Sequence, residues 1–467
     1  MKKKIDTEEL SKMLVNKQEN GFFTVSDKVI EKADKFCEGY KSFLNLAKTE
    51  REAVAYTITE AEKNGFVPFD VNTKYKAGDR VYYNNRGKSI CLAVIGKNSC
   101  INGVRITAAH IDSPRIDLKP IPLFEKNEMA MLKTHYYGGI KKFQWLTIPL
   151  AMHGVAVKKD GTVINICVGE KEGDPQFCIS DILPHLGKDQ SAKPMSTAIN
   201  PEDMNILFGS RPIRDEKAKD GYKLNAMRLL NEKYGIVEAD LISAEIEFVP
   251  SAKACDIGFD RSLIGSYGHD DRVCAYPSLK AIFECKIPES TVVTVLADKE
   301  EIGSQGNTGL QSDFLRYFIT DLAEQEGLKA HHVLSKSTCL SADVTAAYDP
   351  NHAYAYDSLN SCYINHGAGF SKYTGSRGKG GSSDANAEYV AKIRSILDEA
   401  EVVWQIGELG KVDQGGGGTV ASMVANMNVD VIDIGVPVLS MHAPFEVVSK
   451  FDVYMTYKAI KAFYEAK

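Results

Sequence analysis

Two adjacent glutamates, Glu300 and Glu301, follow a short apolar run in the stretch LADKEEIGSQGNTG, residues 296–309. Adjacent charges on a loop usually form a solvated surface pair with no chemical role. A hydrolytic metal site, however, needs two carboxylates with different tasks, because one binds the ion while the other takes a proton from water. The interpretation of this pair therefore depends on which other side chains reach the same place.

Further carboxylates and imidazoles come at or beside the ends of predicted strands. Ligands of parallel α/β sheets gather at the carboxyl ends of the strands, so these side chains are expected at one sheet edge. Taken singly, each has a simpler explanation: a hydrogen-bonded rim histidine, an aspartate that caps a helix, or one that caps a turn. Together they indicate a metal site. The set comprises His110 and Asp112 of VRITAAHID, Glu300 and Glu301, Asp343 of LSAD, His442 of VPVLSMH, and Asp270 and Asp271 of GSYGHDDR.

The spacing of these residues suggests a division of labour. Residues two apart on an extended chain point to the same side, so Asp112 is placed to accept the second ring N–H of His110. Glu301 would bind a metal ion while Glu300 acts as general base on a water whose pKa the metal lowers from about 15.7 toward about 7. A carboxylate such as Asp271 would bridge two ions roughly 3.5–4 Å apart.

The surrounding pattern predicts the elements that hold these residues. Apolar residues recur at helical spacing from about Glu8 to Lys63, which predicts two or three amphipathic helices ending at Gly65. After Cys255, predicted helices and strands alternate, as is typical of an α/β domain with a mostly parallel central sheet flanked by helices. The expected strands there include TVVTVLAD, AHHVLSKSTCLSAD, EVVWQIGE and DVIDIGVPVLS.

Residues 114–251 have a different residue pattern from the rest of the chain, with short predicted strands, prolines and charged loops. They predict a β-rich domain inserted between two parts of the α/β domain, residues 1–113 and 252–467. Within the insert, the polar stretch 187–205 is expected either to be mobile or to line the interior of an assembly. The four glycines at 415–418 are expected to let the backbone approach a neighbour closely before a helix.

Several motifs, in this order and spacing, resemble the aspartyl aminopeptidase and vacuolar aminopeptidase I family of dinuclear zinc exopeptidases. The resemblance extends over nearly the whole chain and implies a metal-dependent aminopeptidase that removes N-terminal residues from peptides. It also implies two divalent metal ions per subunit, with zinc expected and cobalt or manganese as alternatives. The motifs are AAHIDSPRIDLKP, YYGGI, IPLAMH, GHDDRVCAYPSL, DKEEIGSQGNTG, LSADVTAAYDPNH and PVLSMHAPFEVVS.

The resemblance also assigns roles to single residues. Glu300 would be the general base and Asp271 the bridging ligand. Asp271 is preferred to Asp270 because related dinuclear peptidases have the bridging aspartate directly before the residue that opens the helix, although the choice between the two stays open. The implied metal ligands are His110, Asp271, Glu301, Asp343 and His442.

The same resemblance implies an assembly. The insert would be a dimerisation domain, and His153 of IPLAMH would reach the neighbouring subunit's site, where it would contact substrate and stabilise the oxyanion. Dimers would form a hollow tetrahedral dodecamer. From spacing alone, His153 would instead be a hydrogen-bonded interior histidine.

Substrate preference is open. Acid-selective relatives need a cation for the first side chain of the substrate, and Lys372 of GFSKYTG occupies the corresponding place, although a lysine there also fits a solvated loop. Acid-selective members resemble one another in having a histidine three residues after the ligand aspartate, whereas this chain has Ala346. Acidic first residues and neutral or broad specificity both remain alternatives.

Composition excludes other classes. The net charge of −6 and the lack of a long basic run argue against a nucleic-acid partner. No stretch of about 18 apolar residues and no apolar leader segment occurs, so a cytoplasmic protein without a membrane partner is expected. The 10 cysteines are scattered without a C-x-x-C pair, which predicts buried free thiols in a reducing compartment. Neither a disulfide framework nor a cysteine-ligated zinc site is expected.

Two functions of other kinds fit part of the pattern. A related metal amidohydrolase or carboxypeptidase would use the same constellation at the sheet edge. A self-assembling scaffold with a vestigial site would keep the fold, but the complete set of ligand and base residues argues against it.

Overall fold

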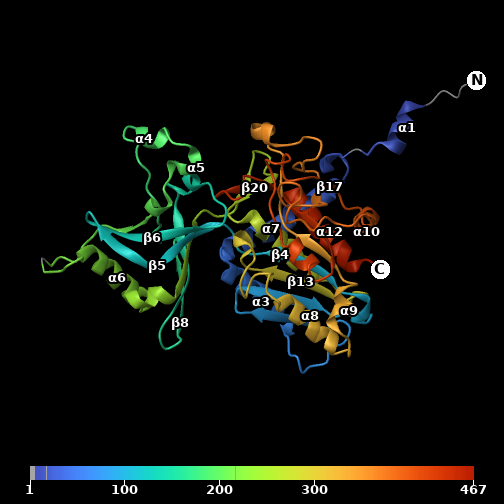
Figure 1. Ribbon diagram of the computed structural model, residues 1–467, viewed down its shortest axis with the longest axis horizontal. Helices are drawn as coiled ribbons and strands as arrows, with labels where there is room; N and C mark the ends of the chain where they lie inside the picture. Colours follow the sequence, from blue (N-terminus) through green and yellow to red (C-terminus); the bar gives the residue numbers. More distant parts are fainter. Residues whose placement is uncertain (1–5, 17, 216) are drawn as a thin grey trace, which may run out of the picture.

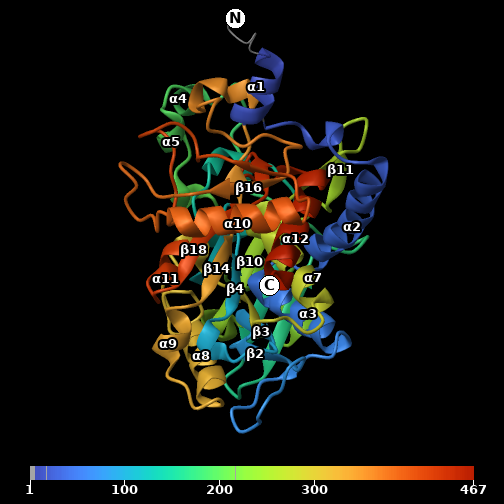
Figure 2. The same ribbon diagram turned by 90° about the vertical axis from the view of Figure 1, so that its right-hand side faces the viewer.

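Helices pack on both faces of a 9-stranded central sheet with the order β1-β2-β3-β13-β4-β14-β18-β16-β17 (Figures 1 and 2). The computed structural model describes residues 6–16, 18–215 and 217–467, so the basic start of the chain lies outside the described residues. The inner strands β13, β4, β14 and β18 are parallel, and antiparallel strands β3 and β16 join them on either side. The predicted α/β architecture is confirmed, with a sheet that is mixed and has a parallel centre. The strands are β1 (Val67–Pro68), β2 (Arg80–Asn85), β3 (Ser89–Val94), β4 (Arg105–His110), β13 (Val292–Ala297), β14 (Thr338–Ala342), β16 (Ala368–Ser371), β17 (Trp404–Ile406) and β18 (Asp430–Gly435).

Two hydrophobic cores, one on each face of this sheet, explain its apolar strands. Along β13, Val292 and Leu296 join the core under α2, α3, α7, α10 and α12, whereas Val293 and Val295 join the core under α8, α9 and α11. A strand buried on both faces has no polar alternation, as expected for the parallel centre of an α/β sheet. The helices are α1 (Thr7–Leu14), α2 (Asp27–Leu46), α3 (Glu50–Lys63), α7 (His269–Glu284), α8 (Phe314–Glu324), α9 (Ala330–Leu334), α10 (Ala387–Glu399), α11 (Ala421–Ala425) and α12 (Lys450–Glu465).

A 6-stranded antiparallel sheet forms a second lobe, which lies on the left in Figure 1. All of its strands, in the order β8-β7-β10-β5-β6-β9, come from the chain between Arg115 and Pro250, the stretch that we call the inserted lobe. The stretch 187–205 contains short helices. The elements are β5 (Arg115–Lys126), β6 (Met129–Tyr137), β7 (Leu150–Val157), β8 (Val163–Val168), α4 (Lys188–Ser191), α5 (Met195–Ala198), β9 (Ile206–Gly209), α6 (Gly221–Tyr234) and β10 (Ala244–Pro250).

A 5-stranded sheet, β11-β12-β20-β19-β15, brings the last candidate residue to the site. The stretch DVIDIGVPVLS was expected to be a single strand, but it divides into β18 of the central sheet and β19 of this small sheet. At the division a Cβ on Gly435 would lie 1.7 Å from the carbonyl oxygen of Asp343, so only glycine fits. The strands are β11 (Cys255–Ile257), β12 (Leu263–Ser266), β15 (Thr345–Ala346), β19 (Pro437–Leu439) and β20 (Glu446–Ser449).

Three smaller expectations can be compared with the structure. The start of AHHVLSKSTCLSAD forms α9, and only its end is the strand β14. All ten cysteines are free and most are buried, but Cys167 and Cys255 are exposed. Among the described residues, no helix combines the length and apolar character that a membrane span requires.

Candidate metal centre

The ends of three parallel strands bring the candidate residues together. Ala297, the last residue of β13, pairs with His110, the last residue of β4, so the two strands end side by side. β14 lies on the other side of β4, and Asp343 follows it directly. Glu300 and Glu301 lie in the turn after β13, in a short 3₁₀ helix. The predicted meeting of these side chains at one sheet edge is therefore what the fold produces.

Asp270, at the start of α7, lies between the two histidines. Its Oδ1 is 3.1 Å from His110 Nε2, and its Oδ2 is 3.2 Å from His442 Nε2. Asp343 joins the first group, with its Oδ1 at 3.7 Å from His110 Nε2, and Glu301 joins the second, with its Oε2 at 3.5 Å from His442 Nε2. Within each group the ligand atoms lie within 4.8 Å of one another. One carboxylate is therefore shared by two potential metal sites.

Asp271, the residue predicted to bridge, does not belong to either group. Its Oδ2 instead accepts a hydrogen bond from the backbone N–H of His110 at 3.2 Å. Asp270 has an extended backbone conformation, with φ −80° and ψ 109°, although α7 already begins at His269. The helix start is therefore irregular at this aspartate pair, so a rule based on the residue that opens a regular helix does not apply directly.

The chemistry of the two groups fits divalent cations. Imidazole nitrogens and carboxylate oxygens are donors that zinc accepts. Glu301 Oε1 is buried and has no hydrogen-bond partner among the described residues, a costly state for a carboxylate oxygen unless a cation binds there. Burial, reinforced by Asp270, raises the pKa of Glu301, as expected for a carboxylate crowded against another without its counter-charge.

Glu300 is close to the two groups but is not a member of either. Its Oε2 is 3.8 Å from His110 Nε2, and its side chain is 17% exposed toward the site. Burial raises the pKa of Glu300 to about 8, and the carboxylates of Asp343, Asp112 and Asp270 act in the same direction. Such a carboxylate can exchange protons near neutral pH.

Asp112 orders the loop that carries both glutamates. Its Oδ1 accepts the backbone N–H of Glu300 and its Oδ2 that of Glu301, each at 3.1 Å. His110 Nδ1 is 3.0 Å from the backbone oxygen of Asp112 and 3.4 Å from its Oδ1. The predicted orientation of His110 by this residue thus comes first from its main chain, while its carboxylate holds the glutamate turn.

The inserted lobe contributes contacts that the sequence analysis missed. His442 Nδ1 donates to the backbone oxygen of Gly139 at 2.7 Å, and the Tyr137 hydroxyl donates to Asp112 Oδ2 at 2.8 Å. A Cβ at Gly139 would lie 3.2 Å from His442 Nδ1, so glycine allows this close approach. The YYGGI motif was a usable signal, but sequence alone does not reveal which side chains it faces.

A cavity of about 550 Å³ opens beside the two groups. Its apolar lining comes mainly from Leu409, Met423 and Met441, and Gly416–Gly418 form part of its wall. All of its lining residues are described in the structure, and none of them is a lysine or arginine. Lys372 is exposed and does not line this cavity, contrary to the expectation that it would face the substrate.

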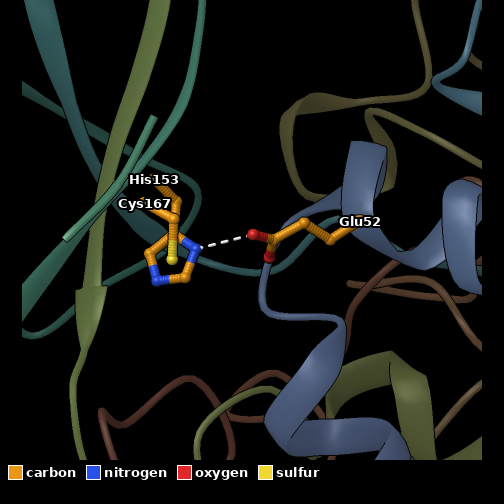
Figure 3. Close-up of side chains that lie close together, drawn as sticks. All are labelled: Glu52, His153 and Cys167. Atoms are coloured by element: carbon orange, nitrogen blue, oxygen red, sulfur yellow. Dashed lines mark hydrogen bonds and ion pairs between the residues drawn. The ribbon is translucent and has the colours of Figure 1, made fainter. Parts of the chain in front are cut away.

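His153 belongs to neither of these two groups and lies beside Glu52 and Cys167 of its own chain (Figure 3). It is 3% exposed, with Nδ1 2.7 Å from Glu52 Oε1 and Nε2 3.0 Å from Glu170 Oε1. Burial alone would lower the pKa of His153, but hydrogen bonds to Cys167, Glu170 and Glu52 raise it to about 11. Within this chain, both ring nitrogens of His153 are engaged by carboxylates. The interior-histidine alternative fits this geometry.

Comparison with known proteins finds relatives along almost the whole chain. The family described as Aminopeptidase I zinc metalloprotease (M18) matches residues 43–464. The chain is 49% identical over 458 residues to a Clostridium acetobutylicum protein named Probable M18 family aminopeptidase 1, covering 96% of this chain and 98% of that protein.

Solved structures show the same relationship. The crystal structure of an M18 aminopeptidase from Thermotoga maritima matches with a TM-score of 0.93 and 41% identity, covering 97% of this chain and 100% of that chain. The S. cerevisiae mApe1 dodecamer shares the fold, with a TM-score of 0.75 at 20% identity over 93% of this chain and 96% of that chain. The family match, the identity and the coverage together show that the chain belongs to the M18 family of zinc metalloproteases and is an aminopeptidase.

Proposed function

We propose that two divalent cations bind at the metal centre and that Asp270, rather than Asp271, bridges them. The observation that carries this proposal is that the two oxygens of Asp270 face different imidazoles, at 3.1 and 3.2 Å. His110 and Asp343 would complete one site, and His442 and Glu301 the other. Zinc fits this donor set, and cobalt and manganese are alternatives. The availability of each metal and the geometry of the site would decide which ion binds.

Glu300 moves the proton in the proposed reaction. When bound, the cations supply Lewis-acid activation of the attacking water and of the scissile carbonyl, and they hold the free α-amine of the peptide. Glu300 takes the proton from the water and returns it to the leaving amine. Its pKa of about 8 without cations would fall when positive charge arrives nearby, which favours the carboxylate that a base requires. Asp112 keeps Glu300 in place through its backbone N–H.

The cavity supports a preference for neutral first residues. Its apolar wall of Leu409, Met423 and Met441 suits an uncharged side chain, because burying a carboxylate without a cation partner is costly. The exposed position of Lys372 and the presence of Ala346 agree with this assignment. We therefore favour neutral or broad specificity over selectivity for Asp and Glu.

The inserted lobe would pair subunits, and the pairs would assemble into a tetrahedral dodecamer in the cytoplasm. The lobe exposes apolar side chains that an assembly would cover, among them Ile121 at 73%, Leu186 at 69% and Met195 at 66% exposure. The mApe1 relative of the same fold is named as a dodecamer. A native mass near twelve times 51.4 kDa would support this assembly, whereas a stable monomer would contradict it.

The test of the function compares the wild type with Glu300→Gln on aminoacyl-anilides, with zinc, cobalt and manganese supplied in turn. Leucyl- and alanyl-anilides should be cleaved faster than aspartyl- and glutamyl-anilides. Glu300→Gln should keep its metal content and lose about 10³-fold or more in kcat. Unchanged turnover in this variant would remove Glu300 from the mechanism.

The same assay separates the alternatives. Cleavage of N-acetylated amino acids in preference to free-amine substrates would favour an amidohydrolase. Protein that binds no metal and cleaves none of the substrates would favour a scaffold.

A further inference from the structure

Glu52, His153 and Cys167 converge at the boundary between the catalytic part of the chain and the inserted lobe (Figure 3). Glu52 lies on α3, whereas His153 and Cys167 lie on the neighbouring strands β7 and β8. One ligand atom from each lies within 4.8 Å of the others, and Glu52 Oε1 is 2.7 Å from His153 Nδ1. None of the three belongs to the metal centre described above.

We propose that this cluster is an additional binding site for a divalent transition-metal ion, with zinc as the best fit, that cross-links α3 to the inserted lobe. Imidazole, carboxylate and thiolate are all zinc donors, and the thiolate disfavours magnesium and calcium. Three protein ligands and one water complete a four-coordinate site. We call it the junction site.

The strand pairing places two of the ligands. His153 and Cys167 are direct partners across the antiparallel pair β7–β8, so their side chains share one face of the sheet. Met152 and Ala156 of the same strand point to the opposite face, into the core of the inserted lobe. Cys167 is exposed, which gives an ion a path to an otherwise buried imidazole.

The third ligand, Glu52, has one carboxylate oxygen that is not used in capping α3. Glu52 Oε2 accepts the backbone N–H groups of Lys48 and Thr49, at 3.0 and 3.1 Å, and so caps the start of α3. Oε1 makes no capping bond and faces His153. Glu52 can therefore bind an ion through Oε1 without giving up its helix cap.

A second carboxylate orients the imidazole. His153 Nε2 is 3.0 Å from Glu170 Oε1, and Lys48 Nζ holds the same oxygen at 2.9 Å. Nε2–H can thus donate to Glu170, which leaves Nδ1 as the ligand atom directed at Glu52 and Cys167. A carboxylate on the far nitrogen is the usual partner of a zinc-bound histidine.

Binding requires only small rearrangements. Tetrahedral zinc with bonds of about 2.0–2.3 Å separates neighbouring donor atoms by about 3.3–3.6 Å. The Glu52–His153 pair would open by less than about 1 Å, which the partly exposed glutamate side chain allows. The thiol proton of Cys167 and any proton on His153 Nδ1 pass to solvent as the ion binds.

Cobalt distinguishes the junction site from the catalytic one. Metal-depleted full-length protein is titrated with Co²⁺, and absorption is recorded in the near ultraviolet, where thiolate-to-cobalt charge transfer appears. The catalytic groups contain only nitrogen and oxygen donors and cannot produce this band. The wild type should show the band and bind one more equivalent of metal per chain than Cys167→Ser, which should lack it.

Cys255→Ser is the matched control, because Cys255 is also an exposed free cysteine but belongs to no potential metal-binding group of the described residues. It should keep both the band and the extra equivalent, and His153→Gln should lose both. Zinc should also slow the reaction of the wild-type protein, but not of Cys167→Ser, with a thiol reagent. No charge-transfer band at saturating cobalt, or a band that survives in Cys167→Ser, would overturn the proposal and leave His153 as a cation between two glutamates.

Discussion

Tyr137 donates its hydroxyl hydrogen to Asp112 Oδ2 at 2.8 Å and thereby connects the inserted lobe to the loop that carries Glu300 and Glu301. The guanidinium of Arg115 lies 3.7 Å from the centre of the tyrosine ring and limits its movement. Burial first, and the Asp112 carboxylate next, raise the pKa of Tyr137, so the hydroxyl remains a donor across the physiological range. The loop of Glu300 and Glu301 is thus positioned partly by the inserted lobe.

Replacing Tyr137 by phenylalanine tests this connection. Tyr137→Phe keeps the ring but leaves one carboxylate oxygen of Asp112 with a single donor, so the glutamate turn should become less well fixed. Loss of an outer hydrogen bond of this kind typically lowers metal affinity about 10–100-fold. Activity measured against buffered free zinc should show the shift, with near-normal kcat at saturating zinc.

The neighbouring Tyr136 provides the control, because it is 38% exposed and points away from this contact. Tyr136→Phe should have the zinc dependence of the wild type. Equal zinc dependence in both variants would mean that the Tyr137 hydrogen bond does not support the centre.

The bridging carboxylate can be identified with two isosteric substitutions. Asp270→Asn should lose most of the metal bound at the centre and more than about 10³-fold in kcat/KM, because an amide cannot bridge two cations. Asp271→Asn should retain metal, since its side-chain oxygen can still accept the His110 backbone N–H. Metal content by mass spectrometry distinguishes the two, and the opposite pattern would restore Asp271 as the bridge.

Substrate charge preference should not depend on Lys372. Lys372→Ala is expected to leave the ratio of kcat/KM for acidic and neutral first residues unchanged within about twofold, because the side chain lies outside the cavity. Met423→Lys, which adds a cation to the cavity wall, should improve acidic substrates by roughly 2–5-fold relative to neutral ones. A large loss of acidic cleavage in Lys372→Ala would show that the lysine reaches the substrate.

The ionisation of Asp256 makes the free energy of unfolding depend on pH in the acid range. Its carboxylate lies 2.7 Å from Lys41 Nζ, 2.8 Å from an Arg261 nitrogen and 3.1 Å from Lys450 Nζ. Burial alone would raise the pKa of Asp256, but these three cations lower it below its ordinary value of 3.8. Because the folded pKa is the lower one, the stabilisation is complete above pH 3.8 and is lost as the pH falls below it.

Asp256→Asn should therefore lower the free energy of unfolding by about 1.5–3 kcal/mol near pH 7 and by much less near pH 2. Chemical denaturation at both pH values measures the difference. Asp34→Asn is the control, because Asp34 is 55% exposed and its contact with Lys450 is 3.9 Å long, so little effect is expected at either pH. An equal loss for Asp256→Asn at both pH values would contradict the linkage.

The strand-end residues could be predicted because their placement follows from local pattern. His110 ends a buried apolar strand, Asp343 directly follows one and Glu301 lies in the turn after one, and parallel strands with aligned ends bring such residues together. The predicted boundaries of the insert rest on a change in residue pattern, to short strands, prolines and charged loops. The strands of the inserted lobe lie within these boundaries. These features depend on periodicity, which a single sequence displays.

Features set by tertiary contacts were less accessible. The choice of Asp270 over Asp271 depends on an irregular helix start, and the engagement of His153 by Glu52 and Glu170 depends on residues from separate elements. The junction site was missed for the same reason, since its cysteine has no C-x-x-C partner and its other ligands are remote in sequence. Residues that meet only through the tertiary fold, without a local motif, cannot be recognised from their spacing in the sequence.

The hydrogen bond between His442 and Gly139 joins residues 303 positions apart in the chain. His110, Asp270 and His442 are also far apart in the sequence, so both ligand groups form only when distant segments of the chain fold together. Without His442, the group of Asp270, Glu301 and His442 has only two of its three members. Loss of the segment that carries His442 would therefore remove one of the two proposed metal sites together with the contact to Gly139.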